Sequence, residues 1–280
     1  MTHRRSSALR AYGCVAAGLL VLAGCSNGGG GKNGAGERIP AGAASGTASA
    51  AATPAPASSG TPTAPLIPEL DESKQPRTAA DARALIGSIA IGQEAFGPEV
   101  GRSTPFESDP ARWPVLDADC VWQTEKLPQD VLATSTRYFQ IPAKDGHGRV
   151  QINATVTVHR SRLESGWETA RAMEEVLRCP DQRLRAGEEL KGLWGASLYQ
   201  GEQVNGWTED AFTESGQYVG EEGGGPHPYL WSQGQFGPVT IAIAGKGAQG
   251  FTPEALSALV VQGTSRMMLQ AHQELGKAAG

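Results

Sequence analysis

The stretch Val150-Gln-Ile-Asn-Ala-Thr-Val-Thr-Val158 decides the fold, because apolar residues alternate with polar ones along its whole length. Successive side chains of a β-strand point to opposite faces, so this strand has one apolar and one polar face. The pattern is typical of an antiparallel sheet that is open to water on one side. Residues 131–141 are rich in β-branched and aromatic types, and Asp145-Gly-His-Gly148 supplies a turn between the two segments. The sequence therefore predicts a long hairpin.

Helices are predicted before and after this hairpin. Thr78-Ala-Ala-Asp81 resembles a capping box, and apolar residues at helical spacing follow it. Ser165-Gly-Trp-Glu168 is a second capping box, and Pro180 ends the helix that it opens. The apolar stripe expected to bury this second helix consists of Trp167, Ala170, Met173 and Leu177.

A third helix is the best signalled, with Thr252 as its N-cap and Pro253 at its first position. Phe251 and Leu256 form a hydrophobic staple around that cap. The apolar stripe of this helix, which must pack on the sheet, consists of Leu256, Leu259, Val260, Gly263, Met267 and Ala271.

The remaining segments are less regular. Residues 101–118 are expected to be irregular, because Pro105, Pro110 and Pro114 interrupt them. Short strands are expected around 194–199 and 207–219, and residues 228–236 are expected to pair with 239–244. Together the elements predict one α+β domain, residues 76–280, built as a twisted antiparallel sheet with helices packed mainly on one face.

The first 24 residues read as a signal peptide. Arg4, Arg5 and Arg10 precede an uncharged run that is too short to span a bilayer. Leu22-Ala-Gly-Cys25 resembles the lipobox of bacterial lipoproteins, which implies cleavage before Cys25 and attachment of lipid to it. An ordinary cleaved signal with a chance cysteine is the alternative. Residues 25–75 are rich in Gly, Ala, Ser and Pro, and are expected to form a disordered spacer between membrane and domain.

Two cysteines, Cys120 and Cys179, remain once Cys14 leaves with the leader and Cys25 carries lipid. Outside the cytoplasm two such thiols should pair. The alternatives are two separate buried thiols or half of a metal site. Neither Cys-x-x-Cys nor closely spaced His accompanies them, so we expect a disulfide and no metal.

Charge excludes one class of partner. The leader holds three of the 24 basic residues and no acidic ones, so the mature chain has 21 basic against 29 acidic residues. An acidic surface argues against nucleic acid and anionic headgroups. Abundant Ala, Gly, Pro and Arg with scarce Lys indicate a GC-rich genome, such as that of an actinobacterium.

No catalytic or cofactor motif is convincing. Gly245, Gly247 and Gly250 match a dinucleotide fingerprint, but Thr252-Pro253 places the helix start beyond the third glycine, and no strand follows that helix. Serine-nucleophile and zinc-protease patterns are absent. The histidines are expected to be solvated at turns and element ends, although His159 is placed to face an acid such as Glu164. We expect no cofactor and no enzymatic activity.

Aromatic residues gather in the middle of the chain, where aliphatic residues are few. They are candidates to line a ligand cleft, and core packing in place of Leu and Ile is the alternative. The six are Trp194, Tyr199, Trp207, Tyr218, Tyr229 and Trp231.

The order of these elements resembles the extracellular PknH-type sensor domain and related actinobacterial lipoproteins. Cys120, Trp122, Trp167 and Cys179 carry the resemblance, which runs loosely over residues 78–275. It implies a twisted antiparallel sheet flanked by helices and a cleft for an extracellular ligand. A second cysteine pair found in that family is absent here.

The expected protein is therefore a lipoprotein on the outer face of the cell membrane, held by membrane lipid through Cys25. Its domain is expected to bind or sense a cell-envelope ligand or a protein partner without catalysis. An enzyme acting on cell-wall material is the first alternative, and acid, His or Ser side chains converging in one cleft would favour it. A structural lipoprotein without a small ligand is the second, and a filled core without a cleft would favour that.

Overall fold

The computed structural model describes residues 67–196, 207–220 and 225–278, all of which belong to the compact unit formed by residues 60–280. The predicted signal peptide, the predicted lipidation site Cys25 and the aromatic Tyr199 lie outside the described residues. Within the described ranges, no helix is both long enough and apolar enough to cross a membrane.

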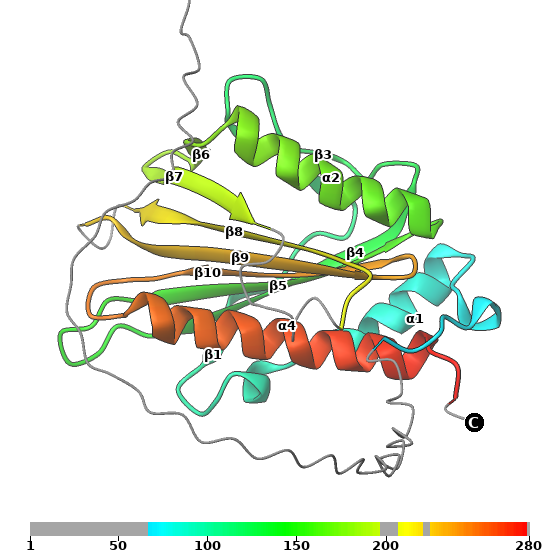
Figure 1. The fold of residues 1–280 in the computed structure, drawn as a ribbon. Helices are drawn as coiled ribbons and strands as arrows, with labels where there is room; N and C mark the ends of the chain where they lie inside the picture. The colour runs from blue at the N-terminus through cyan, green and yellow to red at the C-terminus, as the bar shows by residue number, and fades with distance from the viewer. Residues whose placement is uncertain (1–66, 197–206, 221–224, 279–280) are drawn as a thin grey trace, which may run out of the picture. The chain divides into compact units, whose positions relative to one another are not determined.

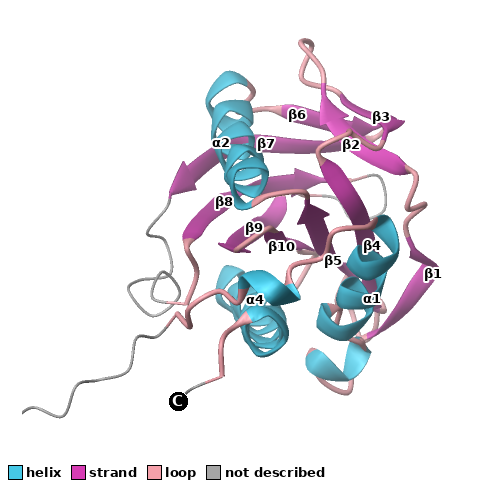
Figure 2. Ribbon diagram, turned by 90° about the vertical axis from the view of Figure 1, so that its right-hand side faces the viewer, coloured by secondary structure: helices cyan, strands magenta, loops and turns pink. Residues whose placement is uncertain are grey.

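An eight-stranded antiparallel sheet forms the centre of this unit (Figures 1 and 2). Its spatial order is β1-β4-β5-β10-β9-β8-β7-β6. The strands are β1 (Gly101–Glu107), β4 (Val131–Ile141), β5 (Val150–His159), β6 (Gln182–Arg185), β7 (Glu188–Ala196), β8 (Asp210–Val219), β9 (His227–Phe236) and β10 (Val239–Lys246). The expected α+β class with an antiparallel sheet is confirmed.

The predicted hairpin is confirmed as β4 and β5, which pair in register from Ala133 opposite Val158 to Ile141 opposite Val150. On its other side β5 pairs with β10, so the last hairpin of the chain, β9–β10, continues the sheet from the first. The expected pairing of residues 228–236 with 239–244 is thereby confirmed.

Two helices, α1 (Ala79–Ile89) and α4 (Pro253–Leu275), cover the apolar face of the sheet (Figure 1). Both begin at the predicted caps: Thr78 and Asp81 form a capping box, and the Thr252 side chain accepts a bond from the Ala255 amide. The predicted stripe of α4 is buried except at Leu259, which is partly buried. A methyl group at Gly245 would lie 2.8 Å from Leu256 Cδ1, so this glycine permits the close approach of α4.

The third helix, α2 (Arg162–Arg178), lies on the opposite face of the sheet (Figure 1). Helices therefore cover both faces, and the expectation that they pack mainly on one face is not confirmed. The helix begins at Ser161, earlier than expected, and its buried residues are Ser165, Thr169 and Val176.

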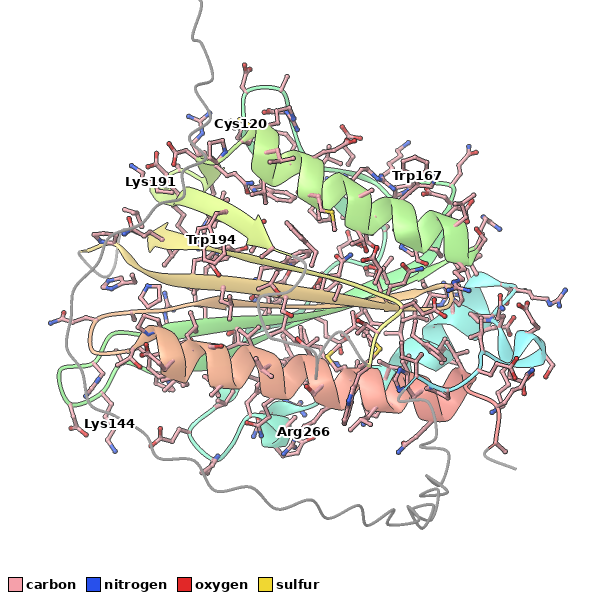
Figure 3. All side chains as sticks on the ribbon, viewed as in Figure 1. Cys120, Lys144, Trp167, Lys191, Trp194 and Arg266 are labelled. Carbon is pink, nitrogen blue, oxygen red and sulfur yellow. A yellow bond between two sulfur atoms is a disulfide. The ribbon has the colours of Figure 1, made fainter. Side chains whose placement is uncertain are left out.

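The predicted apolar stripe of α2 is wrong at Trp167, which is 58% exposed, and at Leu177, which is 84% exposed, whereas Met173 packs against a small apolar cluster as expected. Figure 3 shows Trp167 on the side of α2 away from the sheet. The reason lies in the sheet face that the helix meets, where Gln233 and Gln235 offer amide groups rather than apolar surface. Gln233 Nε2 donates to Thr169 Oγ1 at 2.8 Å, and Gln235 Nε2 donates to Ser165 Oγ at 2.7 Å.

Residues 101–118 are more regular than expected. They contain β1 and also β2 (Arg112–Leu116), which pairs with β3 (Trp122–Lys126) in a separate two-stranded sheet. Pro105 is tolerated because β1 is an edge strand whose register shifts there, and Pro114 because the small sheet has only edge strands.

The ordered domain begins before the expected residue 76. Leu70 forms a β-bridge with Gly276, the Asp71 amide donates to the Leu275 carbonyl at 2.8 Å, and Ile67 packs against the core. Two short 3-10 helices, η1 (Glu72–Lys74) and η2 (Gln93–Ala95), flank α1. Apolar side chains at Ile67 and Leu70 are enough to dock the end of the predicted spacer on α4.

Candidate functional site

A cleft of about 510 Å³ lies between α2, the β2–β3 hairpin and the polar face of the sheet. Its walls come from eight strands and one helix that are far apart in the chain. Two hollows of about 840 and 620 Å³, beside residues 67–75 and around Trp194, are more open to solvent. Ligand sites are typically enclosed and combine apolar walls with a few polar groups, so the first cleft is the candidate.

Threonines form part of the cleft floor. The register of β4 and β5 places Thr134 opposite Thr157 and Thr136 opposite Thr155, and all four side chains face the cleft. The hydroxyl oxygens lie 3.1 Å apart in the first pair and 2.9 Å apart in the second. Thr155 and Thr157 are polar positions of the alternating pattern, so the face that was expected to meet bulk water instead meets a partly enclosed cleft.

Aromatic side chains form much of the wall. Tyr229 and Trp231 come from β9, Tyr138 from β4, and Trp113 and Trp122 from the β2–β3 hairpin. Their orientations are constrained by contacts outside the cleft: Trp231 meets Phe212 edge-on at 6.1 Å between ring centroids, and Trp122 Nε1 donates to Gln182 Oε1 at 2.8 Å.

Glutamates also line the cleft, and three of them lie beneath or on α2. Glu168 and Glu175 lie two turns apart on the inner side of α2, and Glu214 lies across from them on β8. Glu214 is only 8% exposed. Burial raises its pKa from 4.5 to about 7, and the nearby charge of Glu175 adds to the rise, while a hydrogen bond from the Tyr229 hydroxyl opposes it. Burial also raises the pKa of Glu175.

Glu168 is held differently, by two partners from the sheet. The carboxylate oxygen Oε2 lies 2.6 Å from Nε2 of the fully buried His159, and the Thr240 hydroxyl donates to it as well. The expectation of a solvated His159 is wrong, and its acidic partner is Glu168 rather than Glu164. Glu164 instead bonds the Ser161 hydroxyl at the start of α2.

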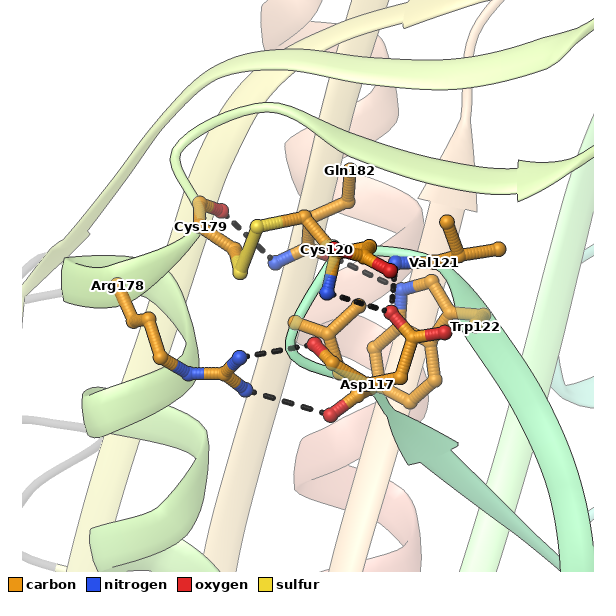
Figure 4. Close-up of a disulfide and its surroundings, with 9 residues drawn as sticks. Asp117, Cys120, Val121, Trp122, Arg178, Cys179 and Gln182 are labelled. Carbon is orange, nitrogen blue, oxygen red and sulfur yellow. Dashed lines mark hydrogen bonds between the residues drawn. A yellow bond between two sulfur atoms is a disulfide. The ribbon is translucent and has the colours of Figure 1, made fainter. Parts of the chain in front are cut away.

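The predicted disulfide between Cys120 and Cys179 is confirmed (Figure 4). It joins the β2–β3 hairpin to the C-terminal end of α2, which are two of the walls of the cleft. Arg178 reinforces this junction by donating to the carbonyls of Asp117 and Leu116, at 2.8 and 3.3 Å. The bond therefore fixes the width of the cleft at one end.

The structure describes five of the six predicted cleft aromatics and separates them. Tyr229 and Trp231 line the cleft. Trp194, which is 49% exposed, lines the hollow of about 620 Å³, and Tyr218 is buried with the Lys246 ammonium 5.1 Å from its ring centroid. Trp207 is partly buried before β8, where its backbone bonds His272.

Sequence reasoning missed most of the cleft lining. The polar positions of the alternating strand pointed to Thr155 and Thr157, and the Cys-x-Trp pattern to Trp122, although neither was read as a cleft signal. Glu175 and Glu214 carry no local pattern, because a helix and a strand bring them together. The glycine fingerprint is a turn: α4 begins at Pro253, beyond Gly250, and the Gly247 amide donates to the Pro228 carbonyl at 2.8 Å.

Comparison with known proteins gives no family: no protein-family model matches the chain, and no curated protein matches it in sequence. Within the described ranges, no group of three or more His, Cys, Asp or Glu side chains is arranged to hold a metal ion. The side chains that line the cleft offer carboxylates, hydroxyls, aromatic rings, an amide and two guanidinium groups.

Proposed function

We propose that this chain is a lipoprotein on the outer face of the cell membrane. Its domain binds a small amphipathic ligand in the cleft beneath α2 without transforming it. The observation that carries the proposal is the cleft itself, where aromatic rings and hydrogen-bonding groups converge around about 510 Å³ of unfilled space. A purely structural lipoprotein has no need of such a space. The resemblance to PknH-type sensor domains supports the same proposal.

The anchor is proposed from the lipobox Leu22-Ala-Gly-Cys25 and the biased composition that follows it. Replacing Cys25 with Ser should move the processed protein from the membrane fraction to the medium. A processed Cys25→Ser protein that stays with membranes would overturn the lipoprotein assignment and leave the binding proposal to be judged separately.

Ligand binding is tested by screening the purified full-length protein against envelope lipids and wall fragments by thermal shift and native mass spectrometry. A ligand at 100 times its dissociation constant adds about 2.7 kcal/mol of stability. Ala242→Phe would fill the cleft from β10 and should abolish the shift, whereas Ala118→Phe in the exposed turn of the β2–β3 hairpin should retain it. Equal shifts in both variants would place binding elsewhere.

A second candidate function is hydrolysis of a wall glycan, which the convergence of Glu175 and Glu214 in one cleft favours. Glycosidases use two carboxyl groups, one protonated as the acid and one ionised. A Glu214 pKa of about 7 fits the role of the acid. Release of reducing ends from purified wall, lost in both Glu175→Gln and Glu214→Gln, would establish this function, and its absence with bound ligand recovered intact would leave the binding role.

A further inference from the structure

The charges around the cleft are unbalanced. Five carboxylates line it, from Glu107, Asp109, Glu168, Glu175 and Glu214, against two guanidinium groups, from Arg112 and Arg171. Three of the carboxylates have partners within the domain: Glu107 pairs with Arg137 at 2.9 Å, Asp109 accepts from the Ala111 amide, and Glu168 has His159 and Thr240. Arg171 lies 3.5 Å from Asp130.

The remaining two carboxylates come from Glu175, whose raised pKa the charges of Arg178 and Arg171 oppose, and from Glu214, which lines the same cleft. Among the residues that the structure describes, neither forms an ion pair, and Glu214 has only the Tyr229 hydroxyl as its side-chain partner. A buried carboxylate without a cation is costly, because the charge has left water and gained only one hydrogen bond. Within the described residues, Glu214 therefore lacks a positive group in direct contact that donates hydrogen bonds.

The aromatic wall suits the same group. Trp113, Trp122 and Trp231 share the cleft with the two carboxylates, and indole faces attract cations through the ring quadrupole. Such a site disfavours anions, because two carboxylates would repel them. A neutral polyol would bond the threonines but would leave the charge of Glu214 uncompensated.

We propose that the ligand of this cleft carries an ammonium group, which lies between Glu175 and Glu214 while the apolar part of the ligand packs on the tryptophans. This inference rests on the proposed binding function and names its ligand class.

The test uses three probes of similar size and different charge: 2-phenylethylamine, 2-phenylethanol and phenylacetate. Each is titrated into the purified full-length protein by calorimetry and by tryptophan fluorescence at about pH 8, where both the amine and Glu214 are charged. We expect the amine to bind at least roughly tenfold more tightly than the alcohol, and phenylacetate to bind more weakly still.

Adjacent residues of α2 provide a matched control. Glu175→Gln and Glu174→Gln make the same change of charge, but only Glu175 lines the cleft, whereas Glu174 is exposed. Glu175→Gln and Glu214→Gln should each bring the affinity for the amine to the level of the alcohol, and Glu174→Gln should leave the preference intact. Glu175 is on a helix surface, so its variant keeps the test available if Glu214→Gln does not fold.

The outcomes separate the two proposals. If the alcohol or phenylacetate binds as tightly as the amine, the ligand class is wrong and the binding function stands. If no probe binds in the millimolar range and the envelope screen also finds no ligand, both proposals fail. A preference for the amine that survives Glu175→Gln and Glu214→Gln would overturn the placement of the ammonium group.

Discussion

The two faces of the central sheet hold their helices by different means. On one face Val239, Ile241 and Ile243 of β10 join the apolar cluster that contains Leu256 and Met267 of α4. On the other face the intervening residues of the same strand, among them Thr240 and Ala242, meet α2 and the cleft.

The difference teaches that burial alone does not dock α2. Its N-terminal half is attached by amide and hydroxyl bonds through Gln233 and Gln235. Its C-terminal half adds Val176 to a small apolar cluster with Leu190 and Phe212, and the disulfide follows at its end. Hydrogen bonds and a disulfide hold a helix at a few points and can leave unfilled space between those points, whereas a close-packed apolar layer leaves none. The face that carries α2 therefore accommodates a cleft beside a small apolar cluster, whereas the larger apolar cluster lies on the other face.

Removing the disulfide should have the largest effect on the polar side. For a loop closed by residues 59 apart, the chain-entropy model gives a stabilisation of roughly 4 kcal/mol. The double variant Cys120→Ser, Cys179→Ser should lose about that much by urea denaturation and should bind any cleft ligand more weakly. An unchanged midpoint would mean that the polar bonds and the apolar contacts of Val176 hold α2 without the disulfide.

On the apolar side, Leu256→Ala should lower the free energy of unfolding by about 3 kcal/mol, because Leu256 is fully buried between α4 and the sheet. Leu269 of the same helix is 41% exposed and serves as control, since Leu269→Ala removes the same atoms at much lower cost. Equal losses in urea denaturation would contradict the assignment of the stabilising core to this face.

Glu214 should make the stability of the polar side depend on pH. Its pKa rises from 4.5 to about 7 on folding, so the folded state binds the proton more tightly and the free energy of unfolding falls as pH rises between these values. The total is on the order of 3 kcal/mol. Glu214→Gln should match the wild type near pH 4 and exceed its stability near pH 8, as urea midpoints across pH would show.

Glu174→Gln is the control for that series. Glu174 is exposed, so its replacement should leave the pH dependence of the unfolding free energy unchanged. If the difference between wild type and Glu214→Gln were the same at both ends of the pH range, Glu214 would not be the group that titrates.

Variants of Thr169 and Gln233 test whether their hydrogen bond stabilises the domain or only determines where α2 docks on the sheet. Thr169→Val leaves the buried Gln233 amide without its partner and should cost about 2 kcal/mol. Adding Gln233→Met removes both polar groups and should recover most of the loss. A double variant as unstable as the sum of both singles would show that the two side chains act independently.

The smallest effect is expected at the outer side of α2. Trp167→Ala should change the free energy of unfolding by no more than about 0.5 kcal/mol, because the ring is largely in water. Val176→Ala, on the buried side of the same helix, should cost more, and a reversed order in thermal denaturation would contradict the orientation of α2.

The sequence by itself determined the elements whose signals are local. Alternation along 150–158 specified β5, Thr78 and Thr252 specified where α1 and α4 begin, and the count of cysteines specified the disulfide. The strand and helix signals depend on contacts within a few residues, and the disulfide depends on covalent chemistry. Neither kind of signal changes with the surrounding structure. β1 and β2 were not predicted, because each contains a proline. A proline forbids a central strand but not an edge strand, and the sequence does not say which strand is at an edge.

Only the tertiary structure decided which side of α2 is buried and which residues form the cleft. The helix carries an apolar stripe with Trp167 and Leu177, but the sheet face beneath it carries amides and hydroxyls, so Ser165 and Thr169 face inward instead. Glu175 and Glu214 meet because α2 crosses over β8, and no spacing in the chain marks that crossing. A helix packs according to the surface opposite to it, and that surface exists only once the strands are assembled.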